Sequence, residues 1–447
     1  MEISFIIFQI LKSWWSFFLP IVLWFPAKFF YLWWIKWEVW YSKFKWILLE
    51  IKPPKEILKP FSAMENVFSI LWGIIDTGNW RERWCEGEWP LGGGLWYSFE
   101  ITSFGGEIHF FIRIPDYFRN TAESAIYSQY PEAEISLAED YTKNVPQNVP
   151  NKEWDIYSED YSLMKPDHFP IKTYPMFFEK EAEEKRVMEE KRMDPIDSLL
   201  EIFSKLQPGE QCWLQIVCNP IFEAIFPWVK KGREAADIIA KRSKAKKLEL
   251  MWPETKKAAE MLISGKAVEE KKEEMELIAP ELRLTPGEKE ILIGIENKIK
   301  KTAYQCWIRQ VYLCKLDEPH FYGNYKAVRG YLCSQFMTQH LNSFIFYGPT
   351  RTRIHYWFRD RRLFLRKRQR LRNYIERLPS LFPRTLTGEP FLSFGHVQGR
   401  RPGIRATIVL NIEELATIYH YPAKIGTPAV APVEAKKVGP PPNLPTE

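Results

Sequence analysis

The densest cluster of side chains that could bind a ligand lies at residues 351–372, RTRIHYWFRDRRLFLRKRQRLR. This stretch holds ten arginine and lysine residues against one acid, Asp360, and aromatic and leucine residues separate the charges. Guanidinium groups bind phosphate through paired hydrogen bonds, and aromatic rings stack on unpaired bases. The candidate contacts with nucleic acid or lipid are Arg359, Arg361, Arg362, Arg366, Lys367, Arg368, Arg370 and Arg372.

Three interpretations of this basic stretch stay open at the level of sequence. A nucleic-acid contact fits the density of arginine and the interleaved aromatic residues. A basic helix that lies on anionic lipid fits the same pattern. The third interpretation is a solvated helix that packs by its aromatic face, with its arginines paired to acidic residues elsewhere in the chain.

No motif for catalysis, a cofactor or a metal accompanies the basic stretch. The sequence contains no GxxxxGK[ST] phosphate loop, no GxSxG, no HExxH and no DxDxDG loop. Its six cysteines include no CxxC pair, and its seven histidines show no ligand spacing. We therefore expect a protein that is not an enzyme and has no cofactor and no metal, with its cysteines as small core residues in a reducing compartment.

The elements that precede the basic stretch follow one pattern twice. In the first pass, alternating segments predict strands and apolar faces at helical spacing predict helices, with a hairpin signal at Gly105-Gly106. The expected elements are strand 44–52, helix 63–75, two strands within 94–115, helix 118–130 and strand 133–140. Their order is β-α-β-β-α-β, which is typical of a ferredoxin-like domain.

A second pass of the pattern follows, divided by a Lys- and Glu-rich helical insertion at about 221–300. Its expected elements are strand 171–178, helix 195–206, strand 211–220, strand 304–315, helix 322–339 and strand 343–348. The predicted fold class is α+β: an N-terminal transmembrane helix, two tandem ferredoxin-like domains of which the second is split by the insertion, then a basic helix and a Pro-rich tail. The predicted divisions are a membrane anchor 1–40, domain 41–142, linker 143–163, domain 164–349, helical region 350–422 and Pro-rich linker 423–447.

Residues 13–35, SWWSFFLPIVLWFPAKFFYLWWI, are predicted to cross a membrane. They carry one charge, Lys28, and a bilayer core needs about 20 apolar residues in a helix. Tryptophans at the ends fit an aromatic belt, and the predicted anchor residues are Trp14, Trp15, Trp24, Trp33, Trp34 and Trp37. An in-plane or re-entrant helix bent at Pro20 and Pro26 is the alternative. Lysines after the segment place the bulk of the chain on the cytoplasmic side of the cytoplasmic membrane.

A short helix is expected near the C-terminus, in LNIEELATIYHYP at 410–422. Asn411 can cap a helix whose third position is Glu414, and Pro422 ends it. Together with the Trp-rich front end and the strings at 44–73 and 99–135, this segment and its Pro-rich tail resemble the region before the motor of membrane-anchored ATPases of the FtsK/HerA superfamily, the conjugation or type IV secretion-like ATPases.

The resemblance implies a non-catalytic, membrane-anchored scaffold of a secretion- or DNA-transfer-type machine. The ATPase domain of the family, with Walker A and Walker B, would follow Pro445, and the sequence ends at Glu447, so no catalytic residue is carried over. The expected partners are membrane lipid, an ATPase motor on another polypeptide and further copies of this chain, since such motors are usually rings. The alternative is a membrane-tethered protein that binds nucleic acid through 351–372.

Overall fold

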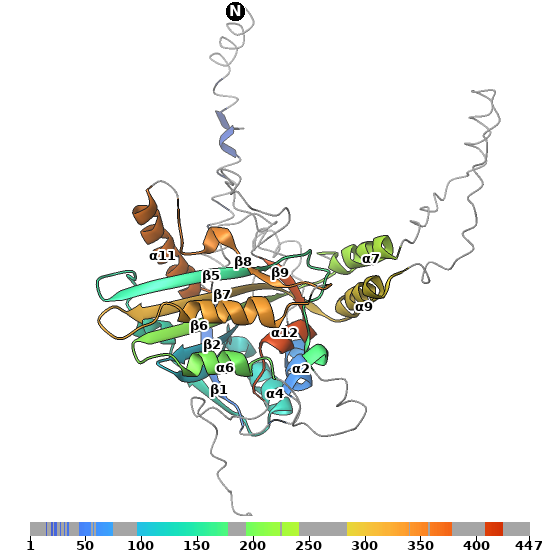
Figure 1. The fold of residues 1–447 in the computed structure, drawn as a ribbon, viewed down its shortest axis with the longest axis horizontal. Coiled ribbons are helices and arrows are strands. Elements are labelled where there is room, and N and C mark those ends of the chain that lie inside the picture. Colours follow the sequence, from blue (N-terminus) through green and yellow to red (C-terminus); the bar gives the residue numbers. More distant parts are fainter. Residues whose placement is uncertain are drawn as a thin grey trace, which may run out of the picture.

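Figure 1 shows a computed structural model of the 447-residue chain. The structure describes residues 44–54, 57, 60–74, 96–177, 194–223, 226–240, 284–338, 340–355, 358–377 and 407–422, together with scattered positions between residues 15 and 34. Across these ranges the chain forms a largely antiparallel sheet with helices packed on both of its faces, so the α+β class is correct.

The first half of the chain builds four antiparallel strands and two helices. Its elements are β1 (Trp46–Lys52), α2 (Pro60–Gly73), β2 (Tyr97–Phe104), β3 (Glu107–Pro115), α4 (Arg119–Gln129) and β4 (Glu134–Ala138). The strands lie side by side in the order β4-β1-β3-β2, connected as a ferredoxin-like unit. Gly105 and Gly106 turn the chain between β2 and β3 with φ of +57° and +101°, which glycine adopts without strain.

The second half repeats this pattern, and its strand order β6-β7-β5-β8 is the same when it is followed from the opposite edge. Its elements are β5 (Trp154–Leu163), α6 (Asp197–Ser204), β6 (Glu210–Pro220), β7 (Ala303–Lys315), α10 (Asn324–Gly330) and β8 (Phe344–Phe346). The prediction of a first strand at 171–178 is wrong. That strand is β5, which lies in the stretch expected to be a linker, and Tyr174–Phe177 forms a 3-10 turn.

Two helices of the predicted insertion pack against each other beside the sheet (Figure 1). They are α7 (Trp228–Ile239) and α9 (Pro286–Lys300), and residues 241–283 between them lie outside the described residues. Residues 178–193, which precede α6 in the chain, also lie outside them. The described residues also contain short helical turns: η4 (Asp116–Phe118), η5 (Tyr141–Asn144), η6 (Tyr174–Phe177), η10 (Gly348–Thr350) and a π-helical turn at Tyr331–Gln335.

The two ferredoxin-like units share one sheet. Strand β2 pairs antiparallel with β6, from Tyr97 opposite Cys218 to Phe104 opposite Gln211. Strand β9 (Ile408–Asn411) pairs with β7 and brings the described sheet to nine strands. The expectation of two tandem domains is corrected accordingly: the units are fused edge to edge, because β2 and β6 satisfy each other's backbone hydrogen bonds and neither remains an open edge.

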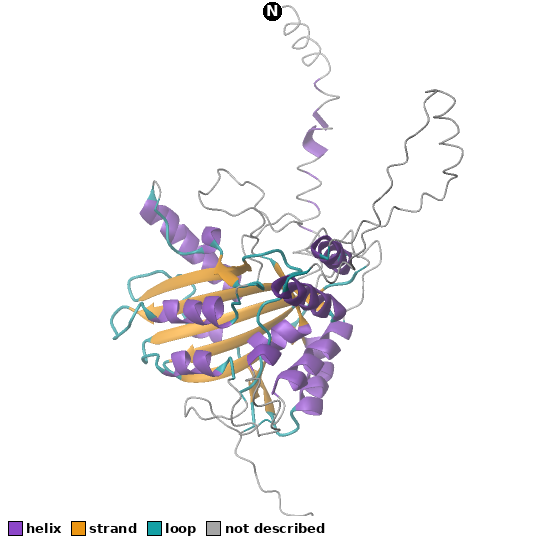
Figure 2. Cartoon of the chain, turned by 45° about the vertical axis from the view of Figure 1, so that its right-hand side comes forward, coloured by secondary structure: helices purple, strands orange, loops and turns teal. Residues whose placement is uncertain are grey.

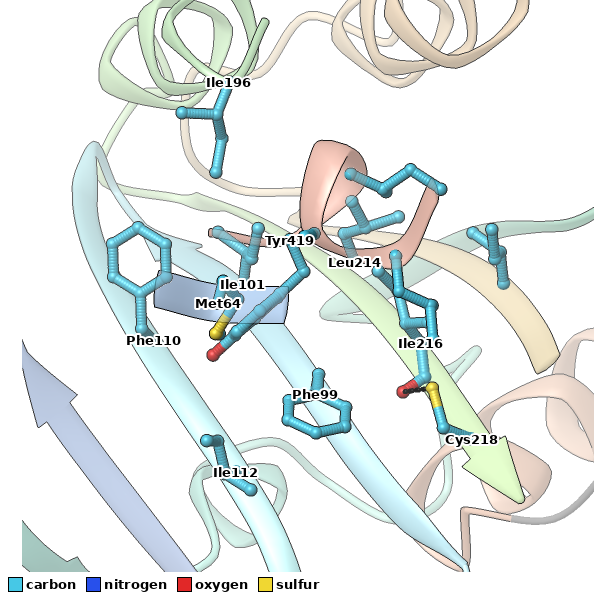
Figure 3. Packing of buried hydrophobic residues seen from close by; sticks show 14 of the residues in the cluster. Met64, Phe99, Ile101, Phe110, Ile112, Ile196, Leu214, Ile216, Cys218 and Tyr419 are labelled. Atoms are coloured by element: carbon cyan, nitrogen blue, oxygen red, sulfur yellow. Dashed lines mark hydrogen bonds between the residues drawn. The ribbon is translucent and has the colours of Figure 1, made fainter. Parts of the chain in front are cut away.

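The main core lies between one face of the sheet and a layer formed by α2, α4, α6, α10 and α12 (Ile412–Ile418) (Figure 2). Figure 3 shows its centre, where Phe99 of β2, Leu214 of β6 and Met64 of α2 surround Tyr419. Alternate residues of each strand point into this core, as expected for strands with one face against helices.

Helix α12 is an integral part of this core and packs on α2. The predicted capping box is confirmed: Glu414 N donates to Asn411 Oδ1 at 2.8 Å, and Asn411 N donates to Glu414 Oε2 at 3.0 Å. Glu414 is fully buried and also binds Lys298 of α9 at 2.9 Å. The Pro-rich tail at 423–447 lies outside the described residues.

The prediction of a transmembrane helix at the N-terminus is contradicted. Over the described positions, no helix combines the length and the apolar character that crossing a membrane requires. Of the predicted anchor residues, Trp15, Trp24 and Trp34 are exposed helical positions. The remaining three, Trp14, Trp33 and Trp37, lie outside the described residues.

Candidate anion-binding cleft at helix α11

The basic stretch folds as α11 (Arg359–Ile375), on the face of the sheet opposite the main core. Its C-terminal half is held down by Leu371 and Tyr374, which join a second apolar cluster that includes Trp213 and Val311. Its N-terminal half reaches past the sheet near β5 (Figure 1). The buried positions are Lys367, Arg370, Leu371, Asn373 and Tyr374.

Two buried arginines share one carboxylate beneath the helix. Arg309 Nε of β7 donates to Asp160 Oδ1 at 3.0 Å, and Arg370 Nη1 donates to Asp160 Oδ2 at 3.2 Å. All three side chains are almost completely buried. Burial lowers the pKa of Arg370 to about 10, so the guanidinium stays charged at neutral pH. Arg309 also donates to the Asn373 carbonyl at 2.8 Å, which ties α11 directly to the sheet.

A second buried ion pair follows the end of α11. Arg377 donates to Glu100 Oε1 at 3.0 Å and to Asp140. Burial opposes both charges, yet the carboxylates raise the pKa of Arg377 well above its usual range, and Arg377 lowers the pKa of Glu100. The Tyr141 hydroxyl and the Gln215 amide also donate to Glu100, at 2.6 and 2.9 Å. A buried carboxylate with this many donors stays ionised at neutral pH.

The structure separates the eight predicted contact residues by environment. Lys367 and Arg370 bind Asp155 and Asp160 and hold the helix in place. Arg366 is half-buried and donates to a backbone carbonyl at 2.8 Å. The exposed residues are Arg359, Arg361, Arg362, Arg368 and Arg372, of which Arg372 pairs with Glu376 at 3.0 Å. Contact with nucleic acid or lipid therefore stays a prediction for the exposed residues. The buried residues Lys367 and Arg370 instead pair with acidic residues elsewhere in the chain.

A cleft of about 330 Å³ opens between the N-terminal half of α11, the edge of β5 and α10. Arg359, Leu363 and Lys367 form one wall; they are spaced four residues apart and so lie on one stripe of the helix. The facing wall includes Tyr157 and Tyr325, whose rings stack with their centroids 5.1 Å apart.

The acidic side chain in the lining is already neutralised. Glu159 accepts two hydrogen bonds from Arg329, at 2.7 and 2.6 Å, and lies 3.7 Å from Arg351. Lys367 is likewise paired, with Asp155. Because the charges within these pairs offset each other, the remaining charged side chains determine the net charge of the cleft.

Those side chains are all basic. Lys326, Arg353 and Arg359 line the cleft and are exposed, and across the residues that the structure places they form no ion pair. The cleft therefore presents an uncompensated positive charge to solvent. Such a site favours an anion, above all a phosphate group, which accepts charge-assisted hydrogen bonds from several donors at once.

The sequence pattern singles out Arg359 but does not group it with Lys326 and Arg353. Arg353 lies in the same basic stretch, so the density of arginine was the available signal. Lys326 is one lysine on α10 with no local feature to mark it, and only the packing of α10 beside β5 and α11 brings it into the cleft.

The described residues offer no metal centre, because no three His, Cys, Asp or Glu side chains among them could hold an ion. Five cysteines are described, all as free thiols, and four of these are buried. Burial raises the pKa of Cys212 to about 12, which keeps this side chain a neutral thiol. The chemistry that the cleft supports is recognition of an anion.

No protein-family model, curated protein or solved structure matches this chain. The class is therefore defined by the fold and the cleft: an α+β protein in which two ferredoxin-like units share one sheet, with a basic cleft at the edge of that sheet. The resemblance to the region before the motor of FtsK/HerA-type ATPases stays a prediction.

Proposed function

We propose that this chain is a non-catalytic scaffold of a secretion- or DNA-transfer-type machine that works with an ATPase motor on another polypeptide. The observation that carries this proposal is the fused sheet. Pairing of β2 with β6 joins the two units through eight residue pairs, and buried ion pairs fix α11 on the same sheet. A scaffold needs surfaces held at fixed positions, and a continuous hydrogen-bonded sheet supplies them.

The helix pair α7 and α9 offers a surface for a protein partner. It lies beside the sheet and exposes two large apolar side chains, Ile238 at 71% and Ile293 at 58%. Exposed apolar residues on paired helices favour contact with another apolar helical surface. The scaffold proposal therefore places the motor contact on this pair.

The test is co-expression with the FtsK/HerA-type ATPases encoded in the same genome, followed by size-exclusion chromatography with light scattering. A motor should co-elute with the chain, and Ile238→Glu with Ile293→Glu should abolish co-elution. Leu137→Glu is the matched control, because Leu137 is 59% exposed on the edge strand β4. Failure of every such ATPase to co-elute, or ATP turnover by the pure chain, would refute the proposal.

A second candidate function is nucleic-acid binding. It is favoured by the exposed arginines in the N-terminal half of α11 and by the basic cleft beside them. Binding through phosphate contacts falls steeply with salt, with a slope of about −0.9 per contact for duplex DNA and about −0.7 for a single strand. Titration of labelled oligonucleotides at several salt concentrations tests this. If the affinity does not change with salt concentration, nucleic-acid binding is excluded and only the scaffold proposal remains.

A further inference from the structure

We propose that the cleft at α11 holds the backbone of single-stranded nucleic acid, with Lys326, Arg353 and Arg359 as its phosphate contacts. This inference rests on the second candidate function above. It adds the form of the nucleic acid and the residues that bind it, two of which the sequence pattern did not single out.

Positive charge surrounds the cleft from several parts of the chain. The three cations come from three different segments: α10, the loop after η10, and the first turn of α11. Each is exposed, whereas the neighbouring Lys367 and Arg351 lie close to carboxylates. A polyanion that enters the cleft therefore meets donors on several sides, and no acid in the lining is left to repel it.

A buried hydroxyl gives independent support. Ser158 of β5 lines the same cleft, and its Oγ is buried and has no hydrogen-bond partner within the described parts of the chain. Buried polar groups almost always have a partner, so one without any at the wall of a cleft indicates a position for a ligand atom. Because the Oγ itself is buried, a phosphate or sugar oxygen would accept from this hydroxyl once the side chain turns toward the cleft.

An exposed aromatic ring lies next in the chain to a residue of the cleft wall. Phe358 directly precedes Arg359, is 80% exposed, and adopts a left-handed φ of 57°. That conformation is costly for a bulky residue, and such strain clusters at functional positions. Bases of a single strand stack on exposed rings of this kind with little sequence preference, while the phosphates follow the basic groove.

The size of the cleft favours one strand over two. Sites for small ligands have volumes of about 300–1,000 Å³, so a cleft of about 330 Å³ accommodates roughly one nucleotide. A duplex, whose major groove alone is about 12 Å wide, is too thick to enter. A duplex could touch only the outer arginines of α11, such as Arg361 and Arg362.

The experiment measures anisotropy of a labelled oligothymidylate and of a labelled hairpin duplex with the full chain, across a salt series. The variant Arg353→Ala/Arg359→Ala should weaken single-strand binding at least about tenfold and make the salt slope shallower by about 1.4. Phe358→Ala should weaken it about fivefold or more without changing the slope. Arg372→Ala, which removes an exposed arginine outside the cleft, should have little effect.

The outcomes separate this inference from the function on which it rests. Loss of single-strand binding in the cleft variants, with Arg372→Ala close to wild type, supports the cleft. Binding that survives in the cleft variants but is lost in Arg361→Ala/Arg362→Ala overturns the cleft and keeps nucleic-acid binding. Absence of any binding by the wild-type chain overturns both. Urea unfolding of each variant shows that its fold is intact.

Discussion

Replacement of Asp160 by asparagine is the sharpest test of what holds α11 on the sheet. Asp160 is fully buried and accepts hydrogen bonds from Arg309 at 3.0 Å and from Arg370 at 3.2 Å. Asparagine keeps the shape but removes the charge, so two guanidinium groups stay buried without their counter-ion. Breaking one buried pair costs about 3–5 kcal/mol. Because one carboxylate serves two pairs here, we expect a loss at the upper end of that range.

The assay is urea unfolding followed by tryptophan fluorescence, with the free energy of unfolding taken by linear extrapolation. Arg370→Met is the informative comparison, because it leaves Asp160 paired with Arg309 and should cost only about 1–3 kcal/mol. The double variant Asp160→Asn/Arg370→Met leaves one unpaired guanidinium instead of two. Its loss should therefore be smaller than the sum of the single losses.

A surface pair supplies the matched control. Glu201→Gln breaks an ion pair on the surface, in which the side chain of Glu201 is 53% exposed and that of Lys205 is 71% exposed. Its loss should cost about 0–1 kcal/mol of unfolding free energy. The reasoning fails if Asp160→Asn is no more destabilising than Glu201→Gln. It also fails if Arg370→Met costs more than Asp160→Asn, since packing of the long side chain, and not charge, would then dominate.

Three further predictions concern the rest of the core. The fold lowers the pKa of Glu100 from 4.5, so its carboxylate stabilises the protein at neutral pH and this contribution is lost as the pH falls through the lowered value. The Glu100→Gln variant should therefore be less stable than the wild type at neutral pH, and it should lose less stability than the wild type when the pH is lowered. Urea unfolding of both proteins at neutral and at acidic pH measures this difference. Asn411→Ala removes the cap of α12 and should cost about 0.5–2 kcal/mol, seen as a lower urea midpoint. Leu214→Ala leaves a cavity in the main core and should cost about 2–5 kcal/mol in the same assay, whereas Leu137→Ala on the exposed edge should cost under about 0.5 kcal/mol.

Local patterns in the sequence carried much of the fold. The alternation in 44–52, the glycine pair at 105–106 and the cap at Asn411 each predict structure from neighbouring residues, and each element lies where it is expected. Strand β5 was missed because WDIYSEDYSL is rich in polar residues. Its acids pair with basic side chains instead of facing solvent: Asp155 with Lys367, Glu159 with Arg329 and Asp160 with Arg309. The pattern of a buried strand is therefore hidden by charges that are neutralised only in the folded protein.

The pairing of β2 with β6 could not be predicted from local sequence patterns. Both strands are predicted from the sequence, at 94–115 and 211–220, but no local pattern indicates that they pair with each other. Strands that pair within a hairpin are specified by their turn, whereas these two are more than a hundred residues apart. Their pairing is specified by side chains that meet only when both units are formed, including the buried hydrogen bond from Gln215 to Glu100 at 2.9 Å.

In the basic stretch, helical periodicity predicts which residues are buried but not which residues they pair with. Lys367 and Arg370 are in phase with Leu363, Leu371 and Tyr374, so a strict helical projection assigns them to the buried face of α11. A basic residue in phase with an apolar stripe must find a carboxylate, and that requirement follows from the sequence alone. Which carboxylate it finds does not: Asp160 lies 210 residues from Arg370, and Asp155 lies 212 residues from Lys367. Exposed arginines lie off this stripe, as Arg361 and Arg362 do, but also on it, as Arg359 does in the first turn of α11. Binding of an anion therefore has to be tested on the exposed residues, whatever their phase.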